Sequence, residues 1–176
     1  CIYNPLDKDN IVYQSKKVGK KYFKTKKIKI LNIGRFTDQK DQITLVKSLN
    51  EVKNKIDFEA IIVGRGILKN QIKQEIDKYK MNNDIKILDF IQNPYPIIRE
   101  SDLFILTSKY EGLPNVLLEA LTLKKFIISS DCETGPKEIL SNGKGGFLFK
   151  VGDYKTLAEK IKLYVKNKKK LKKKIK

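Results

Sequence analysis

Short apolar runs alternate along the chain with longer segments in which apolar residues recur at helical spacing. The first unit is an apolar run over residues 28–33 that ends at Gly34, followed over 43–52 by apolar residues three positions apart. Further strands are expected at 58–63, 85–88, 103–106 and 126–129, and further helices at 68–79, after Pro94, at 116–123, at 136–140 and from Asp153 onward. The pattern therefore predicts strands and helices in alternation.

The composition of the expected strands indicates how they are arranged. They are apolar throughout, which is typical of a parallel sheet with both faces covered. We therefore predict an α/β fold, a Rossmann-like parallel sheet flanked by helices on both faces. A β/α barrel would need eight units and usually about 250 residues, whereas the chain has 176. In an open parallel sheet the ligand binds at the carboxyl ends of the strands, so candidate chemistry is sought in the loops there.

Basic residues are concentrated at the two ends of the chain. Lys and Arg total 38 and Asp and Glu total 20, a formal net charge of +18. Residues 1–29 hold nine Lys and two acidic residues, and residues 150–176 hold twelve Lys and two acidic residues. The 120 residues between them hold 17 basic and 16 acidic ones. We interpret 1–27 as a hinge or linker segment rather than core, 28–165 as the folded domain, and 166–176 as a Lys-rich C-terminal tail.

Such a charge raises nucleic acid or an anionic membrane as a partner. Only three of the basic residues are Arg (Arg35, Arg65 and Arg99), and surfaces that recognise nucleic acid favour Arg for bidentate and stacking contacts. A compositional bias towards Lys, Ile and Asn explains the charge, and no nucleic-acid partner is expected. Attraction of 166–176 to anionic headgroups, about 1 kcal/mol per Lys near the surface, is a further hypothesis.

Several classes of protein are excluded by residues that the chain lacks. His is absent, and Cys1 and Cys132 are the only cysteines, which excludes a zinc cluster, a disulfide framework and a His-dependent triad within this chain. No run of eighteen apolar residues and no secretory signal is visible. We expect a cytoplasmic protein, with peripheral contact at the inner face of the membrane as the hypothesis above allows. Because the chain opens with Cys1 and its only Met is Met81, it is expected to be a piece of a longer polypeptide.

The segment richest in candidate chemistry is Ser108-Lys-Tyr-Glu-Gly-Leu-Pro-Asn-Val-Leu-Leu-Glu119, between an expected strand and an expected helix. Gly112 allows a tight turn, and Pro114 suits a first helical turn. The amides near Asn115 to Leu117 would point out of the helix start, where amides bind an anion without any side chain. A phosphate-bearing ligand is therefore the first expectation.

Charged side chains near the same edge add to this expectation. Glu111 and Glu119 can accept hydrogen bonds from vicinal hydroxyls of a ribose or another sugar. Arg35 and Lys40 follow the carboxyl end of the first expected strand, where they can neutralise a diphosphate and stabilise it as a leaving group. Taken alone, each pair also fits ordinary solvated surface charges. Gly64-Arg-Gly66 lacks the last glycine of a dinucleotide fingerprint and also fits a plain strand-to-helix turn.

In their order along nearly the whole chain, these segments resemble the C-terminal, donor-binding domain of retaining GT-B glycosyltransferases of the family 4 type, also called the glycosyl transferases group 1 domain. The segments that carry the resemblance are Ile2-Tyr-Asn-Pro-Leu-Asp7, Gly34-Arg35 with Lys40, Val63-Gly-Arg-Gly66, Asp102-Leu-Phe-Ile-Leu, Ser108 to Asn115, Glu119-Ala120, Gly135-Pro-Lys-Glu-Ile-Leu140, Gly145-Gly-Phe-Leu and Val151-Gly-Asp153. The pair of Glu with seven residues between them is the most diagnostic.

The resemblance implies the C-terminal half of a GT-B fold, with 28–165 as the nucleotide-sugar donor-binding domain and Ile2 to Asp7 as its hinge. It implies that Glu111 contacts donor-sugar hydroxyls, that Glu119 binds the ribose diol, and that Arg35 and Lys40 offset charge on the departing nucleoside diphosphate. The implied catalytic residues are Arg35, Lys40 and Glu111; the implied donor-binding residues are Gly34, Arg35, Lys40, Glu111, Gly112, Asn115, Val116, Leu117, Leu118 and Glu119; and the implied nucleoside region comprises Gly64, Asp89, Phe90 and Glu119.

The implied reaction is transfer of a hexose or N-acetylhexosamine, with retention of configuration, from a nucleoside diphosphate sugar to a glycan or lipid-linked acceptor. The expected donor is UDP-linked, and no metal or other cofactor is expected. The acceptor site lies, in the family, in an N-terminal domain of the same polypeptide, so this chain alone is expected to be inactive. Two alternatives remain: a sugar-nucleotide epimerase of the same architecture, which the absence of His disfavours, and a basic module that binds nucleic acid or membrane.

Three positions depart from the family pattern. Lys124 and Phe126 stand where Gly and Pro usually follow Glu119, which alters only a helix-to-strand turn. Asp89 stands where a Gly often follows the third strand, close to the expected place of the base. The identity of the base is therefore less constrained by the resemblance than the sugar-phosphate contacts are.

Overall fold

The computed structural model describes residues 6–17, 21–143 and 145–174 and contains a six-stranded, fully parallel sheet of order β3-β2-β1-β4-β5-β6. The strands are β1 (Ile28–Ile33), β2 (Phe58–Val63), β3 (Ile85–Leu88), β4 (Leu103–Leu106), β5 (Phe126–Ser130) and β6 (Phe147–Phe149). The helices are α1 (Lys8–Ser15), the 3-10 turn η1 (Asp38–Lys40), α2 (Gln42–Val52), α3 (Lys69–Lys78), α4 (Tyr95–Glu100), α5 (Asn115–Thr122), α6 (Pro136–Ile139) and α7 (Tyr154–Lys174). The predicted Rossmann-like fold is confirmed.

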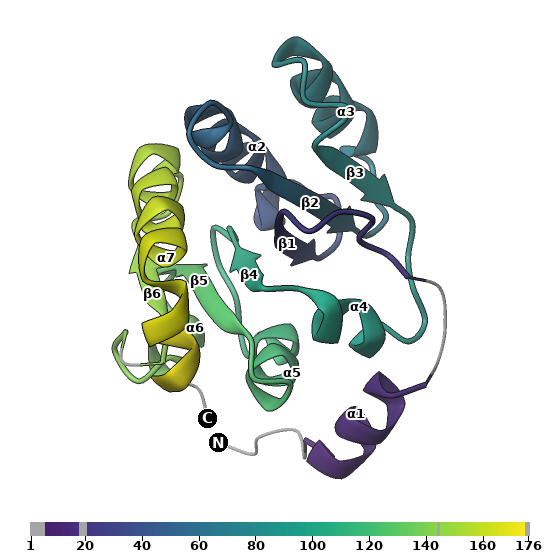
Figure 1. The fold of residues 1–176 in the computed structure, drawn as a ribbon, viewed down its shortest axis with the longest axis vertical. Coiled ribbons are helices and arrows are strands. Elements are labelled where there is room, and N and C mark those ends of the chain that lie inside the picture. Colours follow the sequence, from purple (N-terminus) through teal and green to yellow (C-terminus); the bar gives the residue numbers. More distant parts are fainter. Residues whose placement is uncertain (1–5, 18–20, 144, 175–176) are drawn as a thin grey trace.

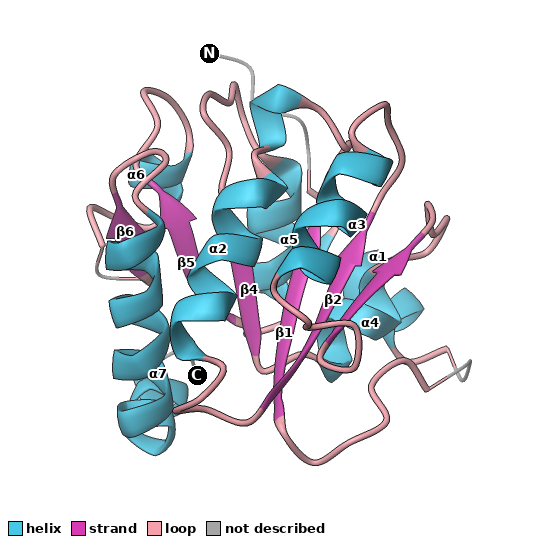
Figure 2. Ribbon diagram, turned by 90° about the horizontal axis from the view of Figure 1, so that it is seen from above, coloured by secondary structure: helices cyan, strands magenta, loops and turns pink. Residues whose placement is uncertain are grey.

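Helices cover both faces of the sheet, as Figures 1 and 2 show. One buried cluster joins the sheet to α2, α3 and α7, and a second joins its other face to α1, α4 and α5. Every residue of β4 and of β5 is buried, which is why these strands read as continuous apolar runs instead of alternating ones. Burial of each large aliphatic side chain contributes about 1.5–3 kcal/mol, so the double-sided core holds the sheet in place.

The order of the strands creates a switch point between β1 and β4. The chain builds β1, β2 and β3 in one direction and then returns to place β4 on the other side of β1. The crossovers after β1 and β4 therefore leave the sheet towards opposite faces, and a crevice opens between the carboxyl ends of these two strands. Asn32 spans the two strands here, because its amide nitrogen donates to the carbonyl of Ile105 at 2.8 Å.

The N-terminal segment contributes more to the core than the sequence predicts. The side chain of Asp7 accepts from the amide of Asn10 at 2.9 Å and caps α1. Ile11 on this helix is only 3% exposed, and Phe23 is fully buried. The prediction that 1–27 is a connector rather than core is wrong for these two residues. The expected hinge, Ile2 to Asp7, lies largely within residues 1–5, outside the described residues.

The C-terminal part of the described chain is helical and belongs to α7. Residues 166–174 of the expected Lys-rich tail extend α7, which packs against α2, β5 and β6. Tyr164 on α7 is buried, stacks on Phe126 with 5.0 Å between ring centroids, and donates its hydroxyl to the carbonyl of Asp102 at 2.8 Å. Among the helices of the described residues, none is both long and apolar enough to cross a membrane.

Candidate functional site

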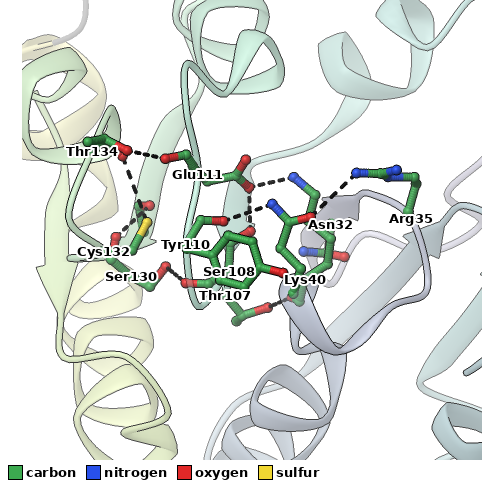
Figure 3. Close-up of polar contacts among 12 residues, drawn as sticks. Asn32, Arg35, Lys40, Thr107, Ser108, Tyr110, Glu111, Ser130, Cys132 and Thr134 are labelled. Carbon is green, nitrogen blue, oxygen red and sulfur yellow. Dashed lines mark hydrogen bonds and ion pairs between the residues drawn. The ribbon is translucent and has the colours of Figure 1, made fainter.

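The loops that follow β1 and β4 are joined by a close ion pair. Lys40 Nζ lies 2.5 Å from Glu111 Oε1, and the two side chains are 15% and 7% exposed. In Figure 3 the two side chains point towards one another from opposite sides of the switch point. Two residues predicted separately as site residues are thus in direct contact, at the edge of the sheet where ligands bind in this class of fold.

Hydroxyl groups surround this pair, from the buried Thr107, Ser108 and Ser130 and the exposed Thr134. Ser108 Oγ donates to Glu111 Oε1 at 2.5 Å, and Thr107 Oγ1 donates to the carbonyl of Lys40 at 2.8 Å. Ser130, at the end of β5, donates to the carbonyl of Ser108 at 2.6 Å, and the Thr134 hydroxyl donates to the carbonyl of Glu111. Sequence reasoning assigned no role to these four residues. The available signal was that Thr107-Ser108 and Ser129-Ser130 directly follow or end buried apolar runs.

Arg35 belongs to the same edge of the sheet. Its guanidinium donates to Gln39 Oε1 at 3.4 Å, and Gln39 in turn donates to the carbonyl of Tyr110 at 3.0 Å. The amide of Lys109 donates to the carbonyl of Gln39 at 2.8 Å. The two loops therefore hold one another by backbone and side-chain bonds, and Arg35 itself stays exposed.

A cavity of about 440 Å³ opens beside Arg35, within the size range of small-molecule sites. Its walls come from the ends of β1 and β2, the loop after β3, and helices α4 and α5: Ile33, Gly34, Arg35, Val63, Gly64, Arg65, Phe90, Ile91, Gln92, Pro94, Tyr95 and Glu119. Five of the predicted site residues line it, namely Gly34, Arg35, Gly64, Phe90 and Glu119. Gly64 has to be glycine, because a Cβ atom there would lie 1.9 Å from the Gly34 carbonyl oxygen.

The cavity and the Lys40–Glu111 pair are neighbours. A Cβ atom placed on Gly34 would lie 3.4 Å from the Lys40 side chain, so the lysine stem passes beside a glycine that lines the cavity. Arg35, Lys40, Glu111 and Glu119 thus gather at one edge of the sheet instead of being spread over opposite faces.

Asp89 is a predicted site residue that the structure places away from the cavity. Its carboxylate lies 2.5 Å from Lys69 Nζ and is 77% exposed, and it does not line the 440 Å³ cavity. Phe90, the next residue, does line the cavity, and the guanidinium of Arg65 lies 5.2 Å from the centre of its ring. Arg65, which the sequence reasoning treated as part of a plain turn, is therefore a further member of this wall.

Glu119 is partly buried between α5 and α4. Desolvation by burial raises the pKa of the Glu119 carboxyl group, and a hydrogen bond from Tyr95 lowers it by a smaller amount. Tyr95 donates its hydroxyl to Glu119 Oε1 at 3.4 Å. Burial also raises the pKa of Tyr95, with the neighbouring Glu119 charge as a second cause. The pair presents one acidic and one phenolic oxygen to the cavity, a combination suited to hydroxyl-bearing ligands.

The start of α5 leaves backbone amides for an anion. The N-cap residue of this helix is Pro114, and no side chain of the described residues caps the helix. The amide of Leu117 donates to the carbonyl of Pro114 at 2.9 Å and is used within the first turn, which leaves the amides of Asn115 and Val116 as the outward-facing donors. The Leu117 side chain is fully buried and Leu118 is partly buried, so neither contributes a polar side chain to the site.

The glycine that the neighbouring turn requires is Gly135. Gly112 is not among the residues with positive φ, and a Cβ atom there would meet nothing within 4 Å. Gly135, in contrast, has φ +85° and would place a Cβ atom 2.6 Å from the Gly112 carbonyl oxygen. The loop after β5 therefore packs tightly on the loop that carries Glu111.

In the part of the chain that the structure describes, no three side chains of His, Cys, Asp or Glu are grouped so as to hold a metal ion. Cys132 is buried, and burial raises the pKa of its thiol. Metal independence stays a prediction.

Comparison with known proteins identifies the family. The family model for glycosyl transferases group 1 matches residues 14–176, and the chain belongs to this family of GT-B glycosyltransferases. An uncharacterized glycosyltransferase of Methanocaldococcus jannaschii is 42% identical over 111 residues, which cover 62% of this chain and 27% of that protein. The resemblance predicted from the motifs is thus confirmed.

One further relative and one solved structure are similar to this chain. One is the Campylobacter jejuni N-acetylgalactosamine-N,N'-diacetylbacillosaminyl-diphospho-undecaprenol 4-alpha-N-acetylgalactosaminyltransferase, 28% identical over 92% of this chain and 42% of its own length. The other is the crystal structure of Anabaena HepE in complex with UDP-glucose, with a TM-score of 0.79 at 22% identity over 85% of this chain and 42% of that chain. The latter likeness shows the fold. The chain spans less than half of each of these proteins.

Proposed function

We propose that this chain is the donor-binding domain of a retaining glycosyltransferase and holds a UDP-linked sugar at the carboxyl edge of its sheet. The observation that carries the proposal is the gathering of Arg35, Lys40, Glu111 and Glu119 beside one 440 Å³ cavity. Family membership supports glycosyl transfer over the epimerase alternative.

In this proposal each part of the donor has its own partners. The diphosphate lies against Arg35, Lys40 and the α5 amides, because cationic side chains and a helix N-terminus both favour negative charge. Glu119 accepts hydrogen bonds from the ribose diol, and Glu111 accepts from the hydroxyls of the sugar.

The base occupies the far end of the cavity. Phe90 and Arg65 form a wall there whose guanidinium and ring already stack on one another, and a planar base can add to such a stack. Asp89 is not assigned to the base, because its carboxylate is exposed and paired with Lys69.

The chemistry that this arrangement supports is departure of the nucleoside diphosphate. As the bond between the sugar and the phosphate breaks, negative charge grows on the β-phosphate oxygens. Preorganised cations stabilise such a charge more than they stabilise the intact donor, which lowers the barrier. Arg35 and Lys40 supply this stabilisation without a metal ion in the proposed reaction.

The rest of the reaction needs residues beyond this chain. An acceptor-binding N-terminal domain of the same polypeptide would supply the acceptor hydroxyl, so the chain alone is proposed to bind donor without transfer. A hexose or N-acetylhexosamine is the proposed sugar, and a glycan or lipid-linked molecule the proposed acceptor, in line with the name of the Campylobacter jejuni relative. The proposed location is the cytoplasm, and peripheral contact with the inner face of the membrane is a further hypothesis.

Calorimetric titration of the chain with UDP and GDP tests the proposal. Saturable binding of UDP with one site is expected, and GDP is expected to bind more weakly. Circular dichroism establishes that the titrated protein is folded. A folded chain that binds neither nucleotide would overturn the proposed function.

A further inference from the structure

We propose that Ser108 is a positioning residue that fixes the carboxylate of Glu111 and reserves one of its two oxygens for the donor sugar. The inference rests on the proposed function, since it concerns how the sugar is held. Ser108 is fully buried and does not line the 440 Å³ cavity, so it acts through Glu111.

Both protein contacts of the Glu111 carboxylate fall on the same atom. Lys40 Nζ and Ser108 Oγ each lie 2.5 Å from Oε1. Among the described residues no hydrogen bond to Oε2 is found. The buried side-chain polar atoms without a partner there are Asn32 Oδ1 and Thr37 Oγ1, and Oε2 is not one of them. Oε2 is therefore not completely buried, although the Glu111 side chain is only 7% exposed. It is the oxygen that a ligand hydroxyl can reach.

Of the two groups on Oε1, the serine is the fixed one. Lys40 has a long flexible stem, and in the proposed function its ammonium also contacts the diphosphate. When the lysine turns towards phosphate, the carboxylate can rotate about its last bond unless another donor holds it. A short hydrogen bond from a hydroxyl to a carboxylate is strong and directional, so Ser108 keeps Oε2 facing the sugar.

The surroundings of Ser108 make its hydroxyl a rigid donor. Its carbonyl accepts from Ser130 Oγ at 2.6 Å, which ties it to the neighbouring strand β5. The carbonyl of Glu111 accepts from the hydroxyl of Thr134 in the loop after β5. Both ends of the turn from Ser108 to Glu111 are thus anchored to the same neighbour (Figure 3).

The test compares binding of UDP with binding of UDP-glucose and UDP-N-acetylglucosamine by calorimetry. In Ser108→Ala the ratio of the Kd for the better-bound UDP-sugar to the Kd for UDP rises about fivefold, about the net effect of one ordinary hydrogen bond, because the Glu111 carboxylate is no longer held towards the sugar. The Kd for UDP stays within about twofold of wild type. Ser108→Thr, which keeps the hydroxyl, restores the ratio. Ser48→Ala is the matched control, because Ser48 is also fully buried and bonds a backbone carbonyl, that of Leu45, at 2.7 Å.

A double-mutant cycle shows whether Ser108 acts through Glu111. In the Glu111→Ala background the further change Ser108→Ala leaves the ratio unchanged, because there is no carboxylate left to orient. If Ser108→Ala does not fold, Ser130→Ala is measured in its place and must raise the ratio in the same direction.

The outcomes separate the inference from the proposed function. A ratio that stays at the wild-type value, or a Kd for UDP that weakens as much as the Kd for the UDP-sugar, would overturn the positioning role while leaving nucleotide binding intact. Absence of UDP binding by the folded wild-type chain would overturn both.

Discussion

Glu119 lies at the cavity, where burial disfavours the charged form of its carboxyl group. It lines the cavity beside Tyr95, and burial raises the pKa of its carboxyl group. A carboxylate is a strong hydrogen-bond acceptor, which suits the proposed contact of Glu119 with a ribose diol.

Replacement Glu119→Ala therefore weakens binding of UDP by about 1–3 kcal/mol, the cost of leaving charge-assisted bonds unmade. Calorimetry measures the change, with Glu75→Ala as the matched control, since Glu75 lies on α3 and does not line the cavity. An unchanged affinity for UDP in Glu119→Ala would reject the assignment of Glu119 to the ribose.

Removing the charge of Glu119 is expected to raise the free energy of unfolding in a pH-dependent way. Because the folded-state pKa of Glu119 is raised, folding favours its protonated form, and its contribution to stability is present at acidic pH and is lost as the pH rises through the folded-state pKa. Glu119→Gln carries no charge and is therefore more stable than wild type at neutral pH. Urea unfolding is measured at about pH 4, below the ordinary pKa of a glutamate, and at about pH 7.5, above it. The difference is expected to be larger at the higher pH. A variant less stable than wild type at neutral pH would contradict the account.

How far the site could be predicted from sequence follows from where each contact lies. The sequence was sufficient to predict four site residues, because their loops follow strands whose carboxyl ends must share one edge of a parallel sheet. These residues are Arg35, Lys40, Glu111 and Glu119. The roles of Ser130 and Thr134 depend on contacts that β5 and the loop after it make with the loop after β4, and no local spacing reveals these contacts.

At the scale of elements, long or uniformly apolar segments were predictable and short or polar ones were not. The predicted bounds of the first four strands agree with the structure. β6 has three residues, too few for a period to be visible. α1 presents one buried aliphatic residue amid polar ones, so its helical pattern is hidden, although Asp7 was an available capping signal.

The turn from α5 to β5 carries a conformation that suits glycine better than lysine. Lys124 has φ +54°, and the amide of Lys125 donates to the carbonyl of Ala120 at 2.9 Å, which closes the end of the helix. A side chain in the left-handed region costs about 1–2 kcal/mol, and this is the position where the family usually has Gly.

Lys124→Gly is therefore expected to raise the free energy of unfolding by about 1 kcal/mol. Lys78→Gly, the same replacement in the last turn of α3, is the matched control and is expected to lower it by about 0.5–1 kcal/mol. Chemical denaturation measures both. A loss of stability in Lys124→Gly would show that the lysine side chain contributes more than the strain costs.

Across the whole molecule, the Lys-rich end of α7 lies at the edge of the sheet opposite the site. Tyr164 and Lys168 both contact Asp102, the residue that precedes β4, so this part of the helix is at the amino ends of the strands. Lys166, Lys169 and Lys170 are exposed there. Attachment of this end to an anionic surface would leave the 440 Å³ cavity accessible to the proposed donor.

Retention by liposomes tests the membrane hypothesis. Vesicles rich in acidic lipid are expected to hold the chain at low salt and release it at high salt, and each lysine near the surface adds about 1 kcal/mol. The triple change of Lys166, Lys169 and Lys170 to Glu weakens retention, whereas neutral vesicles retain neither protein. Failure of acidic vesicles to retain the wild-type chain at low salt would remove the hypothesis without affecting donor binding.

A crystal structure of the chain with UDP bound is the most direct test of the proposed donor site. The nucleotide is expected in the 440 Å³ cavity, with its base against Phe90, its ribose hydroxyls on Glu119 and its diphosphate beside Arg35 and Lys40. Two results would contradict the proposed donor site. One is UDP bound instead in the 230 Å³ pocket that Lys21, Lys24 and Lys86 line. The other is a diphosphate whose oxygens lie away from Arg35 and Lys40.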